Sequence, residues 1–230
     1  KIEQQVDVLC SGSSDEDSAV AFCETIFFDD GSNPSLGKSQ QGRRMGSSDD
    51  PVEWLTDLLG WDGHGGMVAP HAWLVPRDIA CIAGPWRQGL TTDQDGEYFS
   101  RVALASQHIR KTEGKAFYRV HRKQTSQSSR KTATDFRSLL TAIRLKEEHL
   151  LDHARPQQRA RVRAAAARHF MSVAYQAYPM HPAISCIAQK WAQQRSDTVE
   201  MPRPASTRSR ILHRIFGWKL ARKISTLYHG

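Results

Sequence analysis

The chain has 230 residues, of which 39% are apolar and 24% are charged, with six Trp and eight Phe. This composition excludes a collagen-like or wholly disordered chain and suffices for a core of ordinary size. The net charge of +8 is unevenly distributed: residues 1–100 hold 6 Lys and Arg against 17 Asp and Glu (−11), and residues 101–230 hold 26 against 7 (+19). So basic a half favours an anionic partner, such as nucleic acid, anionic lipid or a phosphorylated small molecule.

The first fifty residues predict a helix, a strand and a loop. Ile2, Val6 and Leu9 have helical spacing, so residues 1–9 are expected to form a helix. Residues 18–28 are rich in β-favouring side chains and stop at a turn cluster, which predicts a strand. Residues 31–49 contain almost no large apolar side chain, and their burial would not offset the loss of backbone entropy. We therefore expect a mobile loop there.

The next stretch alternates short helices and strands. Asp50 and Pro51 are suited to begin a helix that ends at Gly60, and residues 67–75 are apolar enough for a buried strand. A short helix should follow Pro76, and a longer one should follow the acidic residues 93–97, because negative charge is favoured at a helix N-terminus. Residues 115–121 alternate in polarity and predict another strand.

After about residue 128 the pattern is helical alone. Helices are expected over 135–151, 157–178 and 182–194, then a linker over 201–209 and a basic amphipathic helix over 210–227. We therefore divide the chain into residues 1–125, a helical extension over 126–200, and a terminal linker and helix over 201–230.

Cysteine usage and hydropathy favour a cytoplasmic protein. The four cysteines are scattered and form no Cys-x-x-Cys pair, which fits reduced thiols packed as small core residues. No run of about eighteen apolar residues occurs, which disfavours a spanning helix.

Three motifs carry the main functional signal. They are His71-Ala-Trp-Leu-Val-Pro-Arg77, Ala83-Gly-Pro-Trp86 and Asp93-Gln-Asp-Gly-Glu-Tyr-Phe-Ser-Arg101. Together they resemble the acceptor-side half of inverting family 2 glycosyltransferases, which have the GT-A fold. The resemblance implies an α/β fold: a partial GT-A, Rossmann-like mixed sheet with an unpaired edge, followed by an all-helical C-terminal extension.

The resemblance also implies a catalytic residue. The general base of the family lies six residues before an Arg. Asp95 lies six residues before Arg101, so the resemblance implies that Asp95 is the base, and Gln94 stands where the family commonly has an acid. Inverting transfer needs one carboxylate to take the proton of the acceptor hydroxyl, unlike glycoside hydrolysis, which needs two carboxyl groups. On the residues alone, an Asp-x-Asp-Gly-Glu string before a helix is more often a cap.

Further residues are implied near the two substrates. Glu97, Trp86, Asp93 and the glycine-flanked His64 are expected near the acceptor, although a plain loop is an equal alternative for His64. The Tyr-Arg-Val-His stretch resembles a loop that closes over the donor diphosphate, which makes Arg119 and His121 diphosphate candidates. A solvated basic strand edge is the alternative for that stretch.

The family binds its nucleotide-sugar donor with an N-terminal half, in which an Asp-x-Asp pair holds a divalent metal. The acidic strings 15–17 and 93–95 do not follow a buried strand, and the opening residues 1–6 resemble the segment just after that motif. We therefore expect an upstream segment to supply the main ligands for Mg²⁺ or Mn²⁺, and this chain to supply no metal ligand.

Two other functions remain open at this point. The chain could be a non-catalytic basic module that binds nucleic acid or an anionic membrane, or a degenerate transferase kept as a scaffold. Nucleic acid is the weaker option, because arginines such as Arg161 and Arg168 spread around their helix and match no known motif. The terminal helix has the pattern of a helix at an anionic membrane face, but packing against earlier helices is slightly favoured.

Overall fold

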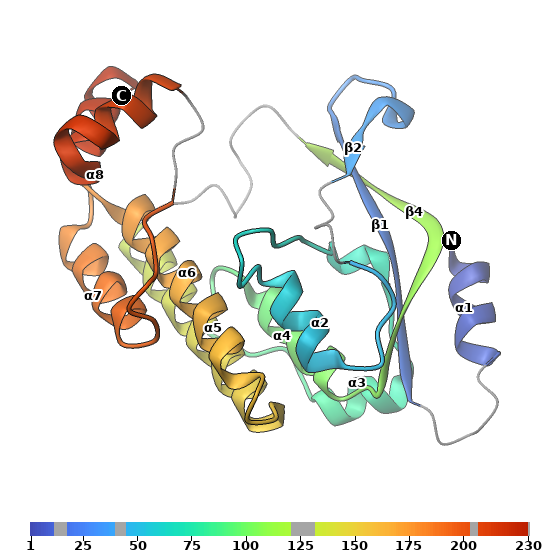
Figure 1. The fold of residues 1–230 in the computed structure, drawn as a ribbon. Helices are drawn as coiled ribbons and strands as arrows, with labels where there is room; N and C mark the ends of the chain where they lie inside the picture. The colour runs from blue at the N-terminus through green and yellow to red at the C-terminus, as the bar shows by residue number, and fades with distance from the viewer. Residues whose placement is uncertain (12–17, 40–44, 121–131, 203–206, 230) are drawn as a thin grey trace.

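The computed structural model describes residues 1–11, 18–39, 45–120, 132–202 and 207–229. Four strands and eight α-helices occur within these ranges, with two short 3-10 helices (Figure 1). In chain order the elements are α1 (Ile2–Cys10), β1 (Ala19–Asp29), η1 (Pro34–Leu36), β2 (Lys38–Ser39), α2 (Pro51–Leu58), η2 (Pro70–Ala72), β3 (Trp73–Leu74), α3 (Arg77–Ala83), α4 (Gln94–Leu104), β4 (His108–Val120), α5 (Ala133–His153), α6 (Arg159–Ala177), α7 (Pro182–Gln193) and α8 (Thr207–His229).

The sheet is mixed and is built around β1. Strand β4 runs parallel to β1 along its whole length, from Ala19 opposite His108 to Asp29 opposite Val120. The other edge of β1 pairs antiparallel with β3 near its start and with β2 near its end. On the outer edge of β4, Ser48 forms one bridge with Ile109, and no strand among the described residues continues the sheet there. The predicted α/β class with a mixed sheet is confirmed.

The two other strand predictions were only partly right. In the 67–75 stretch only Trp73 and Leu74 pair with β1, because Pro70 begins a 3-10 turn instead. Strand β4 begins at His108, seven residues before the expected start at Lys115. Charged residues such as Arg110 and Lys111 hide this part of the strand from a hydropathy pattern, and its pairing with β1 overrides their weak β-propensity.

The mobile loop predicted over residues 31–49 is wrong in its first and last parts. In the first part, η1 forms and Lys38 and Ser39 pair with β1 as strand β2. Residues 40–44 lie outside the described part, but Met45 is buried and the Trp54 indole donates to the Gly46 carbonyl at 2.9 Å. Ser48 and Ile109 exchange backbone hydrogen bonds at 2.8 Å in both directions. A few backbone bonds and one buried side chain thus hold a segment whose polar composition predicted disorder.

The helices predicted after residue 128 are all present, but they do not form a separate unit. Leu150 of α5 and Val162 of α6 belong to the same core as Phe22 of β1, Trp54 of α2 and Val102 of α4. A second core lies among α5, α6 and α7 and contains Phe136, Leu140, Phe170, Met171 and Ile184. The two parts predicted as residues 1–125 and 126–200 therefore share one hydrophobic core.

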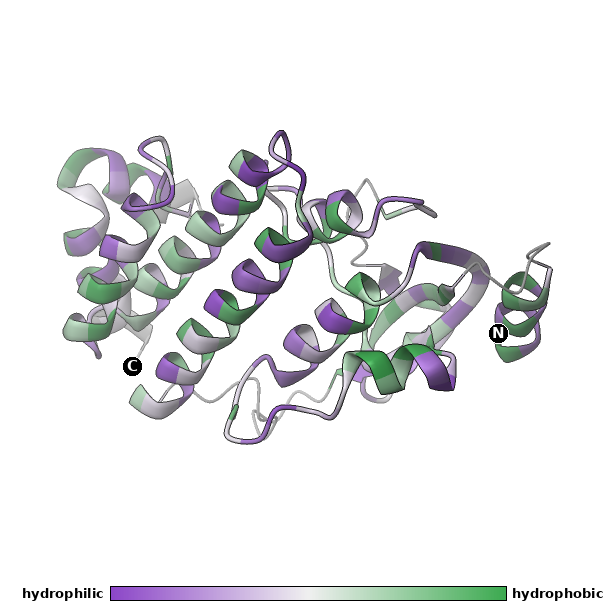
Figure 2. Ribbon diagram, turned by 90° about the horizontal axis from the view of Figure 1, so that it is seen from below, coloured by the Kyte–Doolittle hydropathy of each residue, from purple (hydrophilic) through white to green (hydrophobic). Residues whose placement is uncertain are grey.

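The layers can be followed in the figures. Helices α2 and α4 lie between the sheet and the pair α5 and α6, while α1 packs on the sheet (Figure 1). The long helices carry alternating hydrophobic and hydrophilic bands, as expected for helices with one buried face (Figure 2).

The cysteines differ from the prediction that all four lie in the core. Cys23 is buried on β1, whereas Cys10, Cys81 and Cys186 are exposed, and all four are free thiols. Burial raises the pKa of the Cys23 thiol, so that side chain remains protonated near neutral pH.

The shared core predicts that Leu150→Ala lowers the free energy of unfolding by about 2–5 kcal/mol, because it leaves a cavity where α5 meets the α/β part. Urea unfolding should be followed by helical circular dichroism and by Trp fluorescence, with Leu36→Ala as the control because Leu36 is 79% exposed. We expect the two transitions to coincide and to shift together. Separate transitions for the two probes would contradict a shared core.

Candidate active site

Three acidic residues at the start of α4, namely the N-cap Asp93 and, in the first turn, Asp95 and Glu97, have different surroundings. Asp93 precedes the helix in the left-handed conformation, with φ 59° and ψ 28°, which Asp adopts more readily than most residues. Its side chain does not cap α4 but forms an ion pair with Lys146 of α5, whose side chain is 5% exposed. The carboxylate of Asp93 is thus neutralised by a buried cation from another helix.

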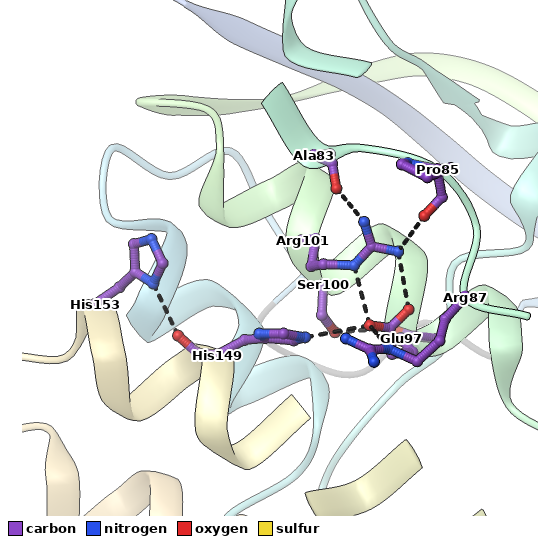
Figure 3. A network of polar contacts seen from close by, with 9 residues as sticks. Ala83, Pro85, Arg87, Glu97, Ser100, Arg101, His149 and His153 are labelled. Carbon is purple, nitrogen blue, oxygen red and sulfur yellow. Dashed lines mark hydrogen bonds and ion pairs between the residues drawn. The ribbon is translucent and has the colours of Figure 1, made fainter. Parts of the chain in front are cut away.

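Glu97 is fully buried, and its carboxylate is enclosed by cationic and polar side chains (Figure 3). Arg101 donates to both of its oxygens, from Nε to Oε1 and from Nη2 to Oε2, each at 3.0 Å. His149 Nε2 lies 3.2 Å from Oε1, and Arg87 Nε lies 3.5 Å from it. Burial alone would raise the pKa of Glu97, but the hydrogen bonds and charges of Arg101 and His149 outweigh it and hold the pKa below its ordinary value.

Arg101 also binds the turn that precedes the site. Its guanidinium donates to the carbonyl of Ala83 and, at 2.9 Å, to the carbonyl of Pro85 (Figure 3). Gly84, with φ 74°, supplies the left-handed conformation that brings these two carbonyls round. The Gly-Pro-Trp turn and the helix, which the sequence related only by spacing, are therefore joined through one arginine.

Helix α5 holds the chain just before α4. The Ser138 hydroxyl accepts from the backbone N–H groups of Thr91 and Thr92, at 2.8 and 3.2 Å. The Thr91 hydroxyl donates to the Asp135 carboxylate at 3.0 Å. With Lys146 and His149, α5 thus supplies four side chains that position the first turn of α4.

Sequence reasoning missed these four α5 residues, although a signal was present. One face of α5, a helix that packs against other helices, carries polar side chains at steps of three or four residues. They are Asp135, Ser138, Lys146 and His149, and Ala142 lies on the same face. Buried polar groups need partners, and such a face indicates that a polar segment packs on it.

Asp95 differs from its two acidic neighbours. Its carboxylate is partly exposed and accepts a hydrogen bond from the N–H of Gly96 at 3.0 Å. Within the part of the chain that the structure describes, no cation pairs with it. Among the described residues, Asp95 is thus the one of the three acids that is partly exposed and carries no ion pair.

Exposed aromatic surface lies beside this carboxylate. Tyr98 follows Asp95 by three residues, and thus lies on the same side of α4. Its ring stacks on Trp86 with the centroids 4.5 Å apart and an interplanar angle of 10°. Trp86 is 44% exposed and also contacts Phe99, which stacks on the buried Trp73. The exposed indole is therefore anchored to the core through a row of aromatic rings.

The other predicted site residues are not joined to this group by any contact of the described residues. His64 is exposed, and its backbone N–H donates to the Asp62 carboxylate. Arg168 binds the same loop by donating to the carbonyl of Trp61. Arg119 lies near the end of β4, with Nη1 3.7 Å from Asp30. His121 lies outside the described residues.

The acidic residues of this site do not fit a divalent metal. Lys146 neutralises Asp93, and Arg101 and His149 enclose Glu97, so Asp95 alone would remain as a ligand. Hard divalent cations need several oxygen ligands. Among the residues described, no group of three His, Cys, Asp or Glu side chains is placed to hold a metal ion.

One further titratable group lies close to this network. His169 of α6 donates from Nε2 to the Leu59 carbonyl at 2.9 Å, and it faces Lys146 across the helix packing. Burial, with a smaller effect of the Lys146 charge, lowers the pKa of His169 to about 4, so the imidazole is neutral at pH 7.

Comparison of the chain with protein-family models, with curated proteins and with solved structures finds no significant match. The function of the site is therefore argued from its own geometry and from the motifs that led to it.

Arg101→Met should lower the free energy of unfolding by about 3–5 kcal/mol, because it leaves the Glu97 carboxylate buried without its main partner. The matched control is Arg144→Met, which removes an i,i+4 pair whose side chains are both about half exposed and should cost less than about 1 kcal/mol. Equal losses in chemical denaturation would show that the Glu97 pair behaves as a surface ion pair.

The neutral state of His169 predicts a pH dependence of stability. Between pH 6.5 and about 4 the unfolded chain binds a proton at this residue and the folded chain does not, so the free energy of unfolding falls as the pH falls. We expect a loss of about 1–2 kcal/mol between pH 7 and pH 5, reduced because the residue retains some exposure.

The measurement is denaturant unfolding at several pH values, with His169→Gln as the comparison. The amide of Gln can still donate to Leu59 but does not titrate. The fall in the free energy of unfolding between pH 7 and pH 5 should therefore be smaller in the variant, and the difference is the contribution of His169. Parallel profiles for the two proteins would mean that His169 titrates normally in the folded state.

Proposed function

We propose that the chain is the acceptor-side part of an inverting glycosyltransferase with a GT-A fold, and that Asp95 is its general base. The proposal depends on one observation: of the three acids at the start of α4, two form ion pairs with Lys146 and Arg101, and Asp95 forms none with the described residues. A base must be accessible to the group whose proton it takes and free to accept that proton. Asp95 is partly exposed and has no ion pair among the described residues, whereas Asp93 is paired with Lys146 and Glu97 is fully buried.

The proposed step is a single displacement. A hydroxyl oxygen of the acceptor forms a bond to the anomeric carbon of the donor sugar while the bond from that carbon to the nucleotide diphosphate breaks. The hydroxyl proton moves to the carboxylate of Asp95, and the nucleoside diphosphate leaves with the bonding electrons. Attack from the face opposite the leaving group inverts the anomeric centre.

The exposed stack of Trp86 on Tyr98 supplies the acceptor surface in this proposal. The flat apolar face of a sugar ring packs well against an aromatic ring. Trp86 offers such a ring, since it stacks on Tyr98, which follows Asp95 by about one turn of α4. Asp93 and Glu97, which were expected to contact the acceptor, instead act as positioning residues, because their carboxylates are occupied by Lys146 and Arg101.

The donor part of the proposal rests on the resemblance alone. A nucleotide-sugar, and Mg²⁺ or Mn²⁺ held mainly by residues outside this chain, would approach from the side of Arg119. His121 stays a diphosphate candidate from the sequence alone, since it lies outside the described residues. Strands β1 and β4 are parallel and Arg119 lies near their carboxyl ends, where ligands of α/β proteins commonly bind. His64 keeps only the weaker role of a loop residue near the acceptor.

A non-catalytic nucleic-acid-binding module is less well supported. It would need free cations gathered on one face, whereas several cations of the basic half form ion pairs with acids of the first hundred residues. Arg155 pairs with Asp50, and Arg161 with Glu53. The charge of the basic half is thus partly used inside the fold.

Asp95→Asn should lower transfer by about 10²–10⁴-fold in the intact protein, because the amide cannot accept the acceptor proton. Release of nucleoside diphosphate would be measured with a panel of nucleoside-diphosphate sugars and glycan acceptors. The thermal midpoint should hardly change, since among the described residues only the Gly96 N–H donates a hydrogen bond to this carboxylate.

The matched control is Asp78→Asn, which changes an exposed acid in the first turn of α3 and should leave turnover as in the wild type. Turnover of Asp95→Asn within twofold of the wild type would remove Asp95 from the role of base. A wild-type protein that releases no nucleoside diphosphate from any donor would favour the degenerate scaffold.

A further inference from the structure

The last helix has a charge pattern unlike that of the rest of the chain. Residues 207–229 contain six Lys and Arg and no Asp or Glu, and large apolar residues are interleaved with them. The helix α8 is broken at Gly217, where φ is 72° and ψ is 161°. It therefore consists of two short helical segments that meet at an angle.

One side of α8 is fixed to α6. The Trp218 ring lies 5.4 Å from the ring of Tyr178 and 6.2 Å from that of Tyr175, between centroids. Arg222 donates to the Tyr178 carbonyl at 3.2 Å, and Ala221 is 2% exposed. This inner side holds α8 at the end of the molecule away from α1 (Figure 1).

The other side of α8 is covered by nothing in the described structure. Ile211, Ile215, Phe216 and Leu220 are between 46% and 64% exposed. We call these four residues, together with the exposed cations Arg214 and Lys219, the outer face of α8. Lys223 is also exposed, but its Nζ lies 6.0 Å from the centre of the Tyr178 ring on the inner side. Packing against the earlier helices, which the sequence slightly favoured, accounts for Trp218 and Ala221 but not for the outer face.

The combination of side chains on the outer face restricts what it can bind. A second copy of the chain would bring an equally positive surface into contact, which like charges oppose. Nucleic acid would pair with the two cations but would leave four aliphatic and aromatic side chains in water. An anionic lipid surface accommodates both kinds at once, because apolar side chains enter the acyl boundary while cations meet the headgroups.

We infer that the outer face of α8 binds the surface of an anionic membrane, with α8 lying along the interface. Within the described residues no helix is both long and apolar enough to cross a bilayer, so the contact would be peripheral. The inner side of α8 keeps its contacts with Tyr175 and Tyr178, which leaves the fold unchanged on binding. This inference is independent of the reaction proposed for Asp95.

The test is flotation of the protein with vesicles of phosphatidylcholine alone and with vesicles that contain about 30% phosphatidylserine, at low and high salt. The apolar variant is Ile215→Ser with Phe216→Ser, and the charge variant is Arg214→Gln with Lys219→Gln. Matched controls are Leu36→Ser with Met180→Ser, at residues 79% and 73% exposed, and Arg137→Gln with Lys190→Gln, at exposed cations of other helices.

We expect wild-type protein to bind the anionic vesicles and not the neutral ones, and to be released at high salt. Each outer-face variant should bind the anionic vesicles at least about tenfold more weakly than the wild type. The controls should bind within twofold of the wild type. Circular dichroism should show unchanged thermal midpoints, since the substituted side chains are exposed.

Four outcomes would overturn the inference. They are absence of vesicle binding, equal binding to both lipid compositions, wild-type affinity of both outer-face variants, and a loss that follows the cations but not the apolar residues. The last would point to nucleic acid, which a competing DNA duplex would test. A dimer in light scattering that the apolar variant dissociates, without vesicle binding, would assign the outer face to a second copy.

Discussion

A buried carboxylate must be paired and hydrogen-bonded to remain ionised, and Glu97 imposes this constraint on everything around it. Arg101 pairs with this carboxylate from the same helix, one turn later, and His149 contacts it from α5. Because the remaining donors of Arg101 hold the carbonyls of Ala83 and Pro85, one ion pair fixes the end of α3, the Gly-Pro-Trp turn and the start of α4 relative to one another. The positions of Trp86 and Asp95 follow from that arrangement.

This constraint separates the roles of acids that are adjacent in sequence. Residues 93–97 present three carboxylates within one helical turn, and their mutual repulsion would be costly if all three faced solvent on the same side. Lys146 draws Asp93 toward α5 and Arg101 draws Glu97 into the interior, which leaves Asp95 directed elsewhere. The neutralised acids thus build a frame for the remaining one, and the buried Lys146 in turn helps to keep His169 neutral.

The sequence predicted what is local and missed what is distant. Helix α4, its Arg101 and the preceding Gly-Pro-Trp turn were predicted because short-range spacing encodes them, although the helix begins within residues 93–97 and not after them. The partners on α5 were not, because Lys146 and His149 lie about fifty positions away, beyond a boundary drawn from composition alone. Distance in the sequence also hid the pairing of Ser48 with Ile109 and of the first half of β4 with β1. In both cases a remote segment orders residues whose own side chains favour neither burial nor a strand.

The split of charge between the two halves of the sequence has a structural explanation that composition could not supply. Acids of the first hundred residues meet cations of the remainder at Asp50 with Arg155, Glu53 with Arg161, Asp93 with Lys146 and Glu97 with Arg101 and His149. The halves therefore attract each other on folding, and most of these contacts lie where α2 and α4 face α5 and α6. Helix α8 lies outside that zone, and Arg214, Lys219 and Lys223 pair with no acid among the described residues. Helix α8 thus combines positive charge that no described acid neutralises with exposed apolar side chains. This coincidence favours an external anionic surface over an internal partner.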